Sequence, residues 1–131
     1  MTIVNNAFSR NVLLADGLMG ILAGIAVAAG STLLAPLLNL PAALLFWAGA
    51  MLLPLGSFIT WMARRDTFPR WMLTEIVFIN VAWTIASFAV MVLGWVQPNL
   101  LGVAFISGQA LAVGLLAALQ MGILHEQSAT A

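Results

Sequence analysis

The sequence predicts an all-α fold, a four-helix transmembrane bundle with up-down-up-down topology and both termini in the cytoplasm. Hydrophobic residues make up 63% of the 131 residues and charged residues 6%, whereas soluble domains carry about 25% charged residues. The apolar residues form four long windows separated by turn residues. The four cations, all arginines, gather in only two places. We therefore expect a small multi-pass membrane protein.

The four windows are long enough to cross a bilayer, since a spanning helix needs about 20 mostly apolar residues. Backbone polar groups in lipid must bond within their own segment, so each window should be a helix. The prolines and asparagine of Pro36–Pro41 and the Gln97–Asn99 segment favour turns between windows. The windows belong to one transmembrane domain, residues 1–131, and run over about 12–35, 42–63, 72–96 and 100–124.

The first window also permits a second interpretation, a secretory signal. Arg10, the apolar run after it and Ala26–Ala28 match the charged, hydrophobic and cleavage regions of such a signal. However, Asp16 interrupts the apolar core, and the run continues beyond the expected cleavage site. These two features favour a permanent span.

The arginines predict the orientation of the chain. Arg10 precedes the first window, and Arg64, Arg65 and Arg70 lie between the second and the third. Positively charged residues in short loops stay on the cytoplasmic side of the membrane. The other two connections contain no cation. The sequence therefore predicts a membrane protein with these interface charges and both termini on the cytoplasmic side.

Small residues predict where the helices approach one another. The first window carries them at a spacing of four, including Gly20 and Gly24, and the fourth window carries a similar ridge that includes Gly114. Membrane helices associate where small residues let backbones come close. The two ridges could meet each other within one bundle, or they could meet a second copy of the chain.

Two carboxylates fall inside the windows, Asp16 and Glu75. Ionisable groups within a membrane are costly and are therefore candidates for function. Counted from the start of its window, each acid lies about 6 Å deep, which suits an interfacial acid paired with a nearby arginine. The alternative is that Asp16, which heads the small-residue ridge, is a proton or cation site facing the bundle.

A second polar group is expected near the midplane. Asn80, Trp83 and Thr84 share one face of the third window, and Gln109 lies at a similar depth in the fourth. One interpretation is a simple interhelical hydrogen bond between Asn80 and Gln109. The other is a small amphipathic pocket. Together with Asp16, these four residues form the candidate intramembrane polar site.

Composition argues against several kinds of function. The chain has no cysteine, a single histidine and zero formal net charge, so no metal site, cofactor site or nucleic-acid surface is expected. We find no nucleophile–base set and no phosphate-binding glycine loop, and we expect no enzyme activity. The expected partners are the lipid bilayer and a second copy or a larger membrane complex.

The chain resembles small bacterial four-span integral membrane proteins without an assigned function. The resemblance covers all four spans through loose apolar patterns at Leu13–Gly17, Leu40–Pro54, Ile79–Ser87 and Gly108–Val113, and it implies the architecture and an inner-membrane location. The chain is also similar to small multidrug resistance transporters, whose first span carries an essential acid that Asp16 loosely matches. It departs from them in the shallow position expected for Asp16 and in its strong arginine asymmetry.

Two functions are compatible with these residues. The first, which the sequence favours because its polar groups are few and can be satisfied in pairs, is a non-catalytic membrane protein that packs with itself or with a larger complex. The second is a small proton- or cation-coupled transporter, or a ligand-binding bundle, that uses Asp16 and the Asn80/Gln109 layer. A cavity shared by Asp16, Asn80 and Gln109 would favour the second.

Overall fold

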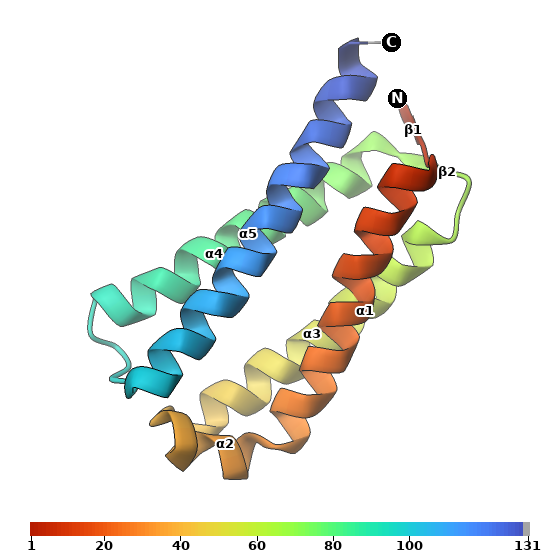
Figure 1. The fold of residues 1–131 in the computed structure, drawn as a ribbon. Helices are drawn as coiled ribbons and strands as arrows, with labels where there is room; N and C mark the ends of the chain where they lie inside the picture. The colour runs from red at the N-terminus through yellow and green to blue at the C-terminus, as the bar shows by residue number, and fades with distance from the viewer. Residues whose placement is uncertain (130–131) are drawn as a thin grey trace.

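The chain folds into four long helices, one short helix and two short strands (Figure 1). The computed structural model describes the backbone of residues 1–129 and the side chains of residues 1–127. The four long helices are long and apolar enough to cross a membrane, with a mean hydropathy of 1.9 to 2.2, which confirms the expected number of long apolar helices. In order, the elements are β1 (Thr2–Val4), α1 (Ala7–Ala29), α2 (Ser31–Leu38), α3 (Ala42–Ala63), β2 (Thr67–Pro69), α4 (Arg70–Val92) and α5 (Leu100–Ala129).

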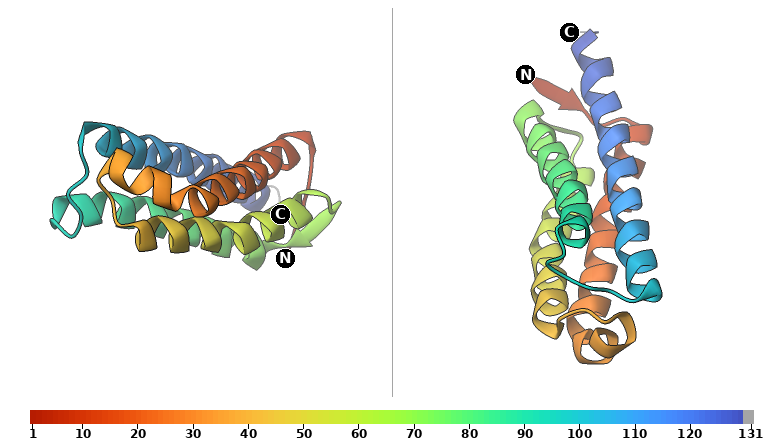
Figure 2. Two further views of the ribbon diagram at one scale, coloured as in Figure 1. Left: turned by 90° about the horizontal axis from the view of Figure 1, so that it is seen from below. Right: turned by 90° about the vertical axis from the view of Figure 1, so that its left-hand side faces the viewer.

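The long helices are arranged as two hairpins. Helix α1 packs along α3, and α4 packs along α5, whereas few contacts join α3 to α4. Figures 1 and 2 show the two pairs side by side, with the chain termini at one end and α2 at the other. We call these units the α1/α3 hairpin and the α4/α5 hairpin.

Three of the four expected helix ranges need correction. Helix α1 begins at Ala7, because the side chain of Asn6 accepts a hydrogen bond from the Ser9 amide at 2.9 Å and caps the helix. It ends at Gly30, and α2 follows as a separate helix closed by the left-handed Asn39. The first span is therefore 7–29 rather than 12–35. The third is 70–92 rather than 72–96, the fourth runs to 129 rather than 124, and the second is 42–63 as expected.

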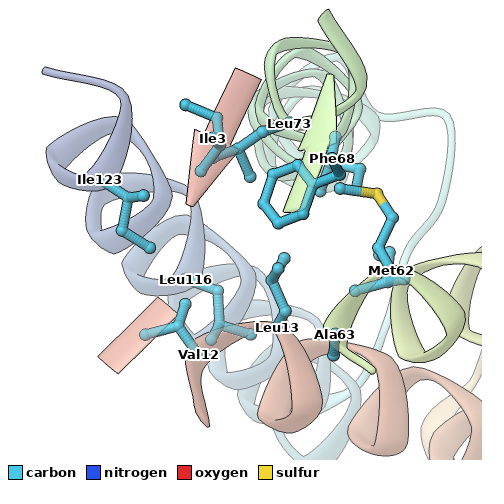
Figure 3. Close-up of a cluster of buried hydrophobic side chains, with 11 residues drawn as sticks. Ile3, Val12, Leu13, Met62, Ala63, Phe68, Leu73, Leu116 and Ile123 are labelled. Carbon is cyan, nitrogen blue, oxygen red and sulfur yellow. The ribbon is translucent and has the colours of Figure 1, made fainter. Parts of the chain in front are cut away.

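The terminal end of the bundle is closed by a two-stranded ribbon that the sequence did not predict. Strand β1 pairs antiparallel with β2, with Ile3 opposite Phe68. The Gln127 side chain accepts from the Val4 amide at 2.9 Å and donates to the Val4 carbonyl at 2.7 Å. Below the ribbon, side chains from both hairpins form a hydrophobic cluster (Figure 3). It comprises Ile3, Val12, Leu13, Ile59, Met62, Ala63, Phe68, Leu73, Ile76, Leu116 and Ile123.

The opposite end is closed by asparagines and a smaller cluster. Asn39 donates to the Gln97 carbonyl at 2.6 Å, and Asn99 donates to the Leu37 carbonyl at 2.8 Å. These bonds tie the loop before α3 to the loop before α5. The buried residues of this second cluster are Leu38, Leu40, Leu45 and Ile106. The two hairpins are thus joined at both ends.

Glycines set the close packing inside the α1/α3 hairpin. A Cβ placed on Gly24 would lie 2.8 Å from the Gly49 carbonyl oxygen, and one on Gly56 would lie 2.7 Å from that of Gly17. The small-residue ridge of the first span therefore packs against glycines of the second, not against the ridge of the fourth. In the fourth span, a Cβ on Gly114 would lie 3.5 Å from Thr84, in ordinary contact.

Candidate functional site

A cleft of about 450 Å³ lies between the two hairpins. All four long helices contribute to its walls, and the two hydrophobic clusters bound it at either end. Most of the lining is apolar. Large side chains on its walls are Met19, Trp47, Met51, Trp83 and Phe105, and the polar ones are Asp16, Asn80, Ser87 and Gln109.

Asp16, Asn80 and Gln120 form a hydrogen-bonded group at the terminal side of the cleft. The Oδ2 atom of Asp16 accepts from Asn80 Nδ2 at 2.9 Å and from Gln120 Nε2 at 2.7 Å. Asn80 Nδ2 also donates to Gln120 Oε1 at 3.0 Å. The exposed fractions of the three residues are 8%, 4% and 0%. One carboxylate from α1 is thus held by one amide from α4 and one from α5.

Two acceptor oxygens of this group accept no hydrogen bond from the described residues. Every fully buried side-chain oxygen or nitrogen among the described residues has a hydrogen-bond partner. Oδ1 of Asp16 and Oδ1 of Asn80 have no partner within that part of the chain, so both oxygens border open space. Asp16 and Asn80 are both among the residues that line the cleft. It therefore offers hydrogen-bond acceptors, one of them on a carboxylate, to a bound donor.

Asp16 lies farther from the start of its helix than its place in the sequence predicted. It is nine residues from the start of α1, or about 13 Å along the helix, because the helix begins at Ala7. Asn80 lies about 15 Å from the start of α4 by the same measure. The expectation that Asp16 pairs with an arginine is wrong, because the partners of its carboxylate are Asn80 and Gln120. Arg10 instead contacts Asp66 at 3.4 Å.

A second polar group lies farther from the termini and holds the side chain of Gln109. Trp83 Nε1 donates to Gln109 Oε1 at 2.8 Å, and Gln109 Nε2 donates to Ser87 Oγ at 2.9 Å. The expected Asn80–Gln109 contact does not form, because the pairing of α4 with α5 places Thr84 beside Ala110, where its hydroxyl lies 3.3 Å from the Ala110 carbonyl. The candidate polar site therefore splits into two groups.

The interface charges lie outside the cleft. Glu75 is exposed on α4. Arg70 donates to the Leu124 carbonyl at 3.1 Å, and the guanidinium of Arg65 lies 4.9 Å from the centroid of the Trp61 ring. Arg64 is exposed just after α3. None of these side chains lines the cleft.

Sequence reasoning left Gln120 out of the candidate site. Its signal was present, because a glutamine within an apolar span needs a hydrogen-bond partner, and Gln120 lies on the same face of the helix as Gln109. The sequence did not predict how far α5 extends. Because α5 reaches residue 129, Gln120 lies about 13 Å from the end of its helix, the same distance as Asp16 from the start of α1.

Comparisons of the chain with protein-family models, with curated proteins and with solved structures found no match. No group of three or more histidine, aspartate or glutamate side chains that could hold a metal ion occurs among the described residues. The functional interpretation therefore rests on the cleft and its carboxylate.

Proposed function

We propose that this chain is a ligand-binding bundle of the bacterial inner membrane, or a small cation- or proton-coupled transporter, that binds a lipophilic cation in the cleft. The observation that carries this proposal is Asp16, which lines the cleft and whose carboxylate is buried between three helices, with hydrogen bonds to only one of its oxygens. In this proposal the protein binds its ligand without catalysing a reaction and needs no cofactor.

The physical argument concerns the cost of a carboxylate within the bilayer. Ionisable side chains inside a membrane are expensive and face the bundle interior or a cavity. The amides of Asn80 and Gln120 satisfy one oxygen of Asp16, and a cation in the cleft would satisfy the other. Trp47 and Trp83 also line the cleft, and aromatic faces attract cations. The apolar walls suit the hydrocarbon part of such a ligand.

Binding of tetraphenylphosphonium to the chain in liposomes tests this proposal. Asp16→Asn keeps the shape of the side chain but removes its negative charge, and should weaken binding at least about tenfold, which corresponds to ~1.4 kcal/mol. Glu75→Gln is the matched control, because it neutralises an exposed carboxylate outside the cleft, and it should bind like the native chain. Equal binding by the native chain and Asp16→Asn would reject the site. Uptake of the same cation above empty liposomes would distinguish a transporter from a binding protein.

A second candidate function is a non-catalytic protein that packs with itself or with a larger membrane complex. Its support is that only 11% of the most apolar window of α4 is buried and that few contacts join α4 to α3. The partner would fill the cleft, since Gly24 is already covered by α3. Val90→Trp adds bulk to the cleft wall and should then dissociate the assembly in detergent. If the native chain is already monomeric in detergent and in lipid, this second function is excluded.

The proposed orientation places both termini in the cytoplasm. Its support is that Arg10, Arg64, Arg65 and Arg70 all lie at the end of the bundle that holds the termini. Reporter fusions should report a cytoplasmic location after residue 67 and at the C-terminus. Fusions after residues 38 and 98 should report a periplasmic one. A periplasmic signal after residue 67 would contradict the orientation.

A further inference from the structure

A second hollow, separate from the cleft, lies on the surface of the α1/α3 hairpin near the arginines. It is a shallow groove of about 450 Å³ and shares no lining residue with the cleft. Helix α1 contributes one residue, and the C-terminal part of α3 with the residues after it contributes the rest. We call it the Arg64 groove, and its lining residues are Ile21, Ser57, Thr60, Trp61, Arg64 and Arg65.

The Arg64 groove carries two positive charges that the protein does not neutralise. Asp66, the adjacent acid, contacts Arg10 at 3.4 Å. Within the part of the chain that the structure describes, no carboxylate pairs with Arg64 or Arg65. The guanidinium of Arg65 lies 4.9 Å from the centroid of the Trp61 ring, so this cation is held over the aromatic wall of the groove. An anion is therefore the complementary ligand.

The groove also extends into the apolar part of the hairpin. Ser57 lies seven residues before Arg64, or about 10 Å along α3, and Ile21 comes from the middle of α1. The hydroxyl of Ser57 donates to the Leu53 carbonyl at 2.7 Å, and that of Thr60 donates to the Gly56 carbonyl at 2.8 Å. Their donors are thus used within the helix. The groove is cationic at one end, and the rest of its lining consists of Ile21, Trp61 and two residues whose hydroxyl donors are used within α3.

We infer that the Arg64 groove binds an anionic phospholipid, with the headgroup phosphate at Arg64 and Arg65 and the upper acyl chain along Trp61 and Ile21. Guanidinium groups bind phosphate oxygens through paired N–H donors. Basic pockets beside membrane helices select anionic headgroups, and tryptophan favours the level of the headgroups. A phosphate free in water would use the arginines but leave the apolar length of the groove empty, so a lipid is the better match.

Lipid binding to the full chain in detergent, followed by native mass spectrometry, tests this assignment. Phosphatidylglycerol and phosphatidylcholine with identical acyl chains are compared. The native chain should prefer phosphatidylglycerol, and the double variant Arg64→Gln/Arg65→Gln should lose at least about tenfold of that preference. The matched control Arg10→Gln/Arg70→Gln removes the same charge at the same end of the bundle but outside the groove, and should retain it.

A third variant keeps the test independent of charge and folding. Ser57→Leu adds bulk to the exposed part of the groove away from the arginines without changing any charge, and it should weaken phosphatidylglycerol binding while both arginines remain. The assignment would be overturned if both arginine double variants lost the preference for phosphatidylglycerol equally. It would also be overturned if Arg64→Gln/Arg65→Gln kept the native preference. Full displacement of the lipid by millimolar inorganic phosphate would also overturn it, because the site would then recognise phosphate alone.

Discussion

Helix α1 has two interfaces that differ in almost every physical respect. Toward α3, backbone meets backbone, as a Cβ on Gly24 would lie 2.8 Å from the Gly49 carbonyl oxygen. Toward α4 and α5, the contact in the middle of the bundle is made by the side chains of Asp16, Asn80 and Gln120. The first interface leaves no space, and the second borders a cleft of about 450 Å³.

The difference shows how a short chain can be both stable and open. In lipid there is no hydrophobic drive between helices, so dispersion contacts at small residues hold the α1/α3 hairpin together. Hydrogen bonds between membrane helices contribute only about 0.6 kcal/mol on average, so the polar interface adds less but requires a defined geometry. The two hairpins therefore meet firmly at their ends and loosely between them.

The largest expected effect comes from the close interface. Gly24→Leu adds a side chain where a Cβ alone would already lie 3.1 Å from Leu52 and Leu53 atoms, and should lower the unfolding free energy by at least ~3 kcal/mol, because the helices must separate. The measurement is unfolding by sodium dodecyl sulfate in mixed micelles.

Gly122→Leu is the matched control for this change. Nothing lies within 4 Å of a Cβ at Gly122, so the same substitution should leave stability within ~0.5 kcal/mol. Val90→Leu, on the wall of the cleft, should also be mild. Equal losses in the two glycine variants would show that the α1–α3 contact is not a close one.

The next effect comes from the polar interface. Gln120→Leu removes one donor to the Asp16 carboxylate and the acceptor used by Asn80, and should cost ~1–3 kcal/mol, because buried polar groups lose their partners. The same micelle titration measures it. Thr74→Ala, which removes an exposed hydroxyl bonded to the Arg70 carbonyl, serves as the control and should change stability by less than ~0.5 kcal/mol. If Gln120→Leu leaves the free energy of unfolding unchanged, the polar group does not join the hairpins.

A smaller effect is expected where the hairpins meet at the end opposite the termini. The Asn99 side chain accepts from the Gly102 amide at 2.8 Å and donates to the Leu37 carbonyl. Asn99→Ala should cost ~1–2 kcal/mol, because α5 loses its N-cap and the loops lose a bond. Hydrogen exchange of the backbone amides within residues 97–102 should become faster. Asn11→Ala, an exposed asparagine, should leave this exchange unchanged, and no rise in Asn99→Ala would show that the loop is held by other contacts.

The smallest effect is expected at the ion pair between Arg10 and Asp66. Arg10 and Asp66 are 36% and 100% exposed and their closest atoms are 3.4 Å apart, so Arg10→Gln should cost less than ~1 kcal/mol. The difference should vanish in 1 M salt, which shortens the screening length to about 3 Å. A loss that persists in high salt would indicate that Arg10 contributes through packing.

Hydropathy predicted the four long helices well because it measures what a bilayer requires, about 20 apolar residues per crossing. It failed at the ends for the same reason. Asn6, Ser9 and Arg10 lower the average of any window, yet they lie at the start of α1 because Asn6 caps the helix. The short helix α2 was missed because an apolar run continues through Gly30, where the chain turns.

The candidate site was only partly predictable. Asn80, Trp83 and Gln109 were identified by spacing along each helix, and all three line the cleft. Which of them touch depends on the pairing of one helix with another, which the spacing within a helix does not contain. The glycines Gly49 and Gly56 of the second span are seven residues apart, about two turns, and this spacing could have identified the face that meets α1.

The ribbon at the terminal end sets an order on assembly during synthesis. Val4 is made early, but its side-chain partner Gln127 is 123 residues farther along the chain. The α1/α3 hairpin can close by glycine contacts as soon as its second helix has entered the membrane, since its contacts are nearer in sequence. The hydrogen bonds between Val4 and Gln127 must wait until the last helix is complete. Protection of the Val4 amide from hydrogen exchange therefore reports that α5 has packed against the first strand. A truncated chain that ends before Gln127 would lack these hydrogen bonds to the first strand.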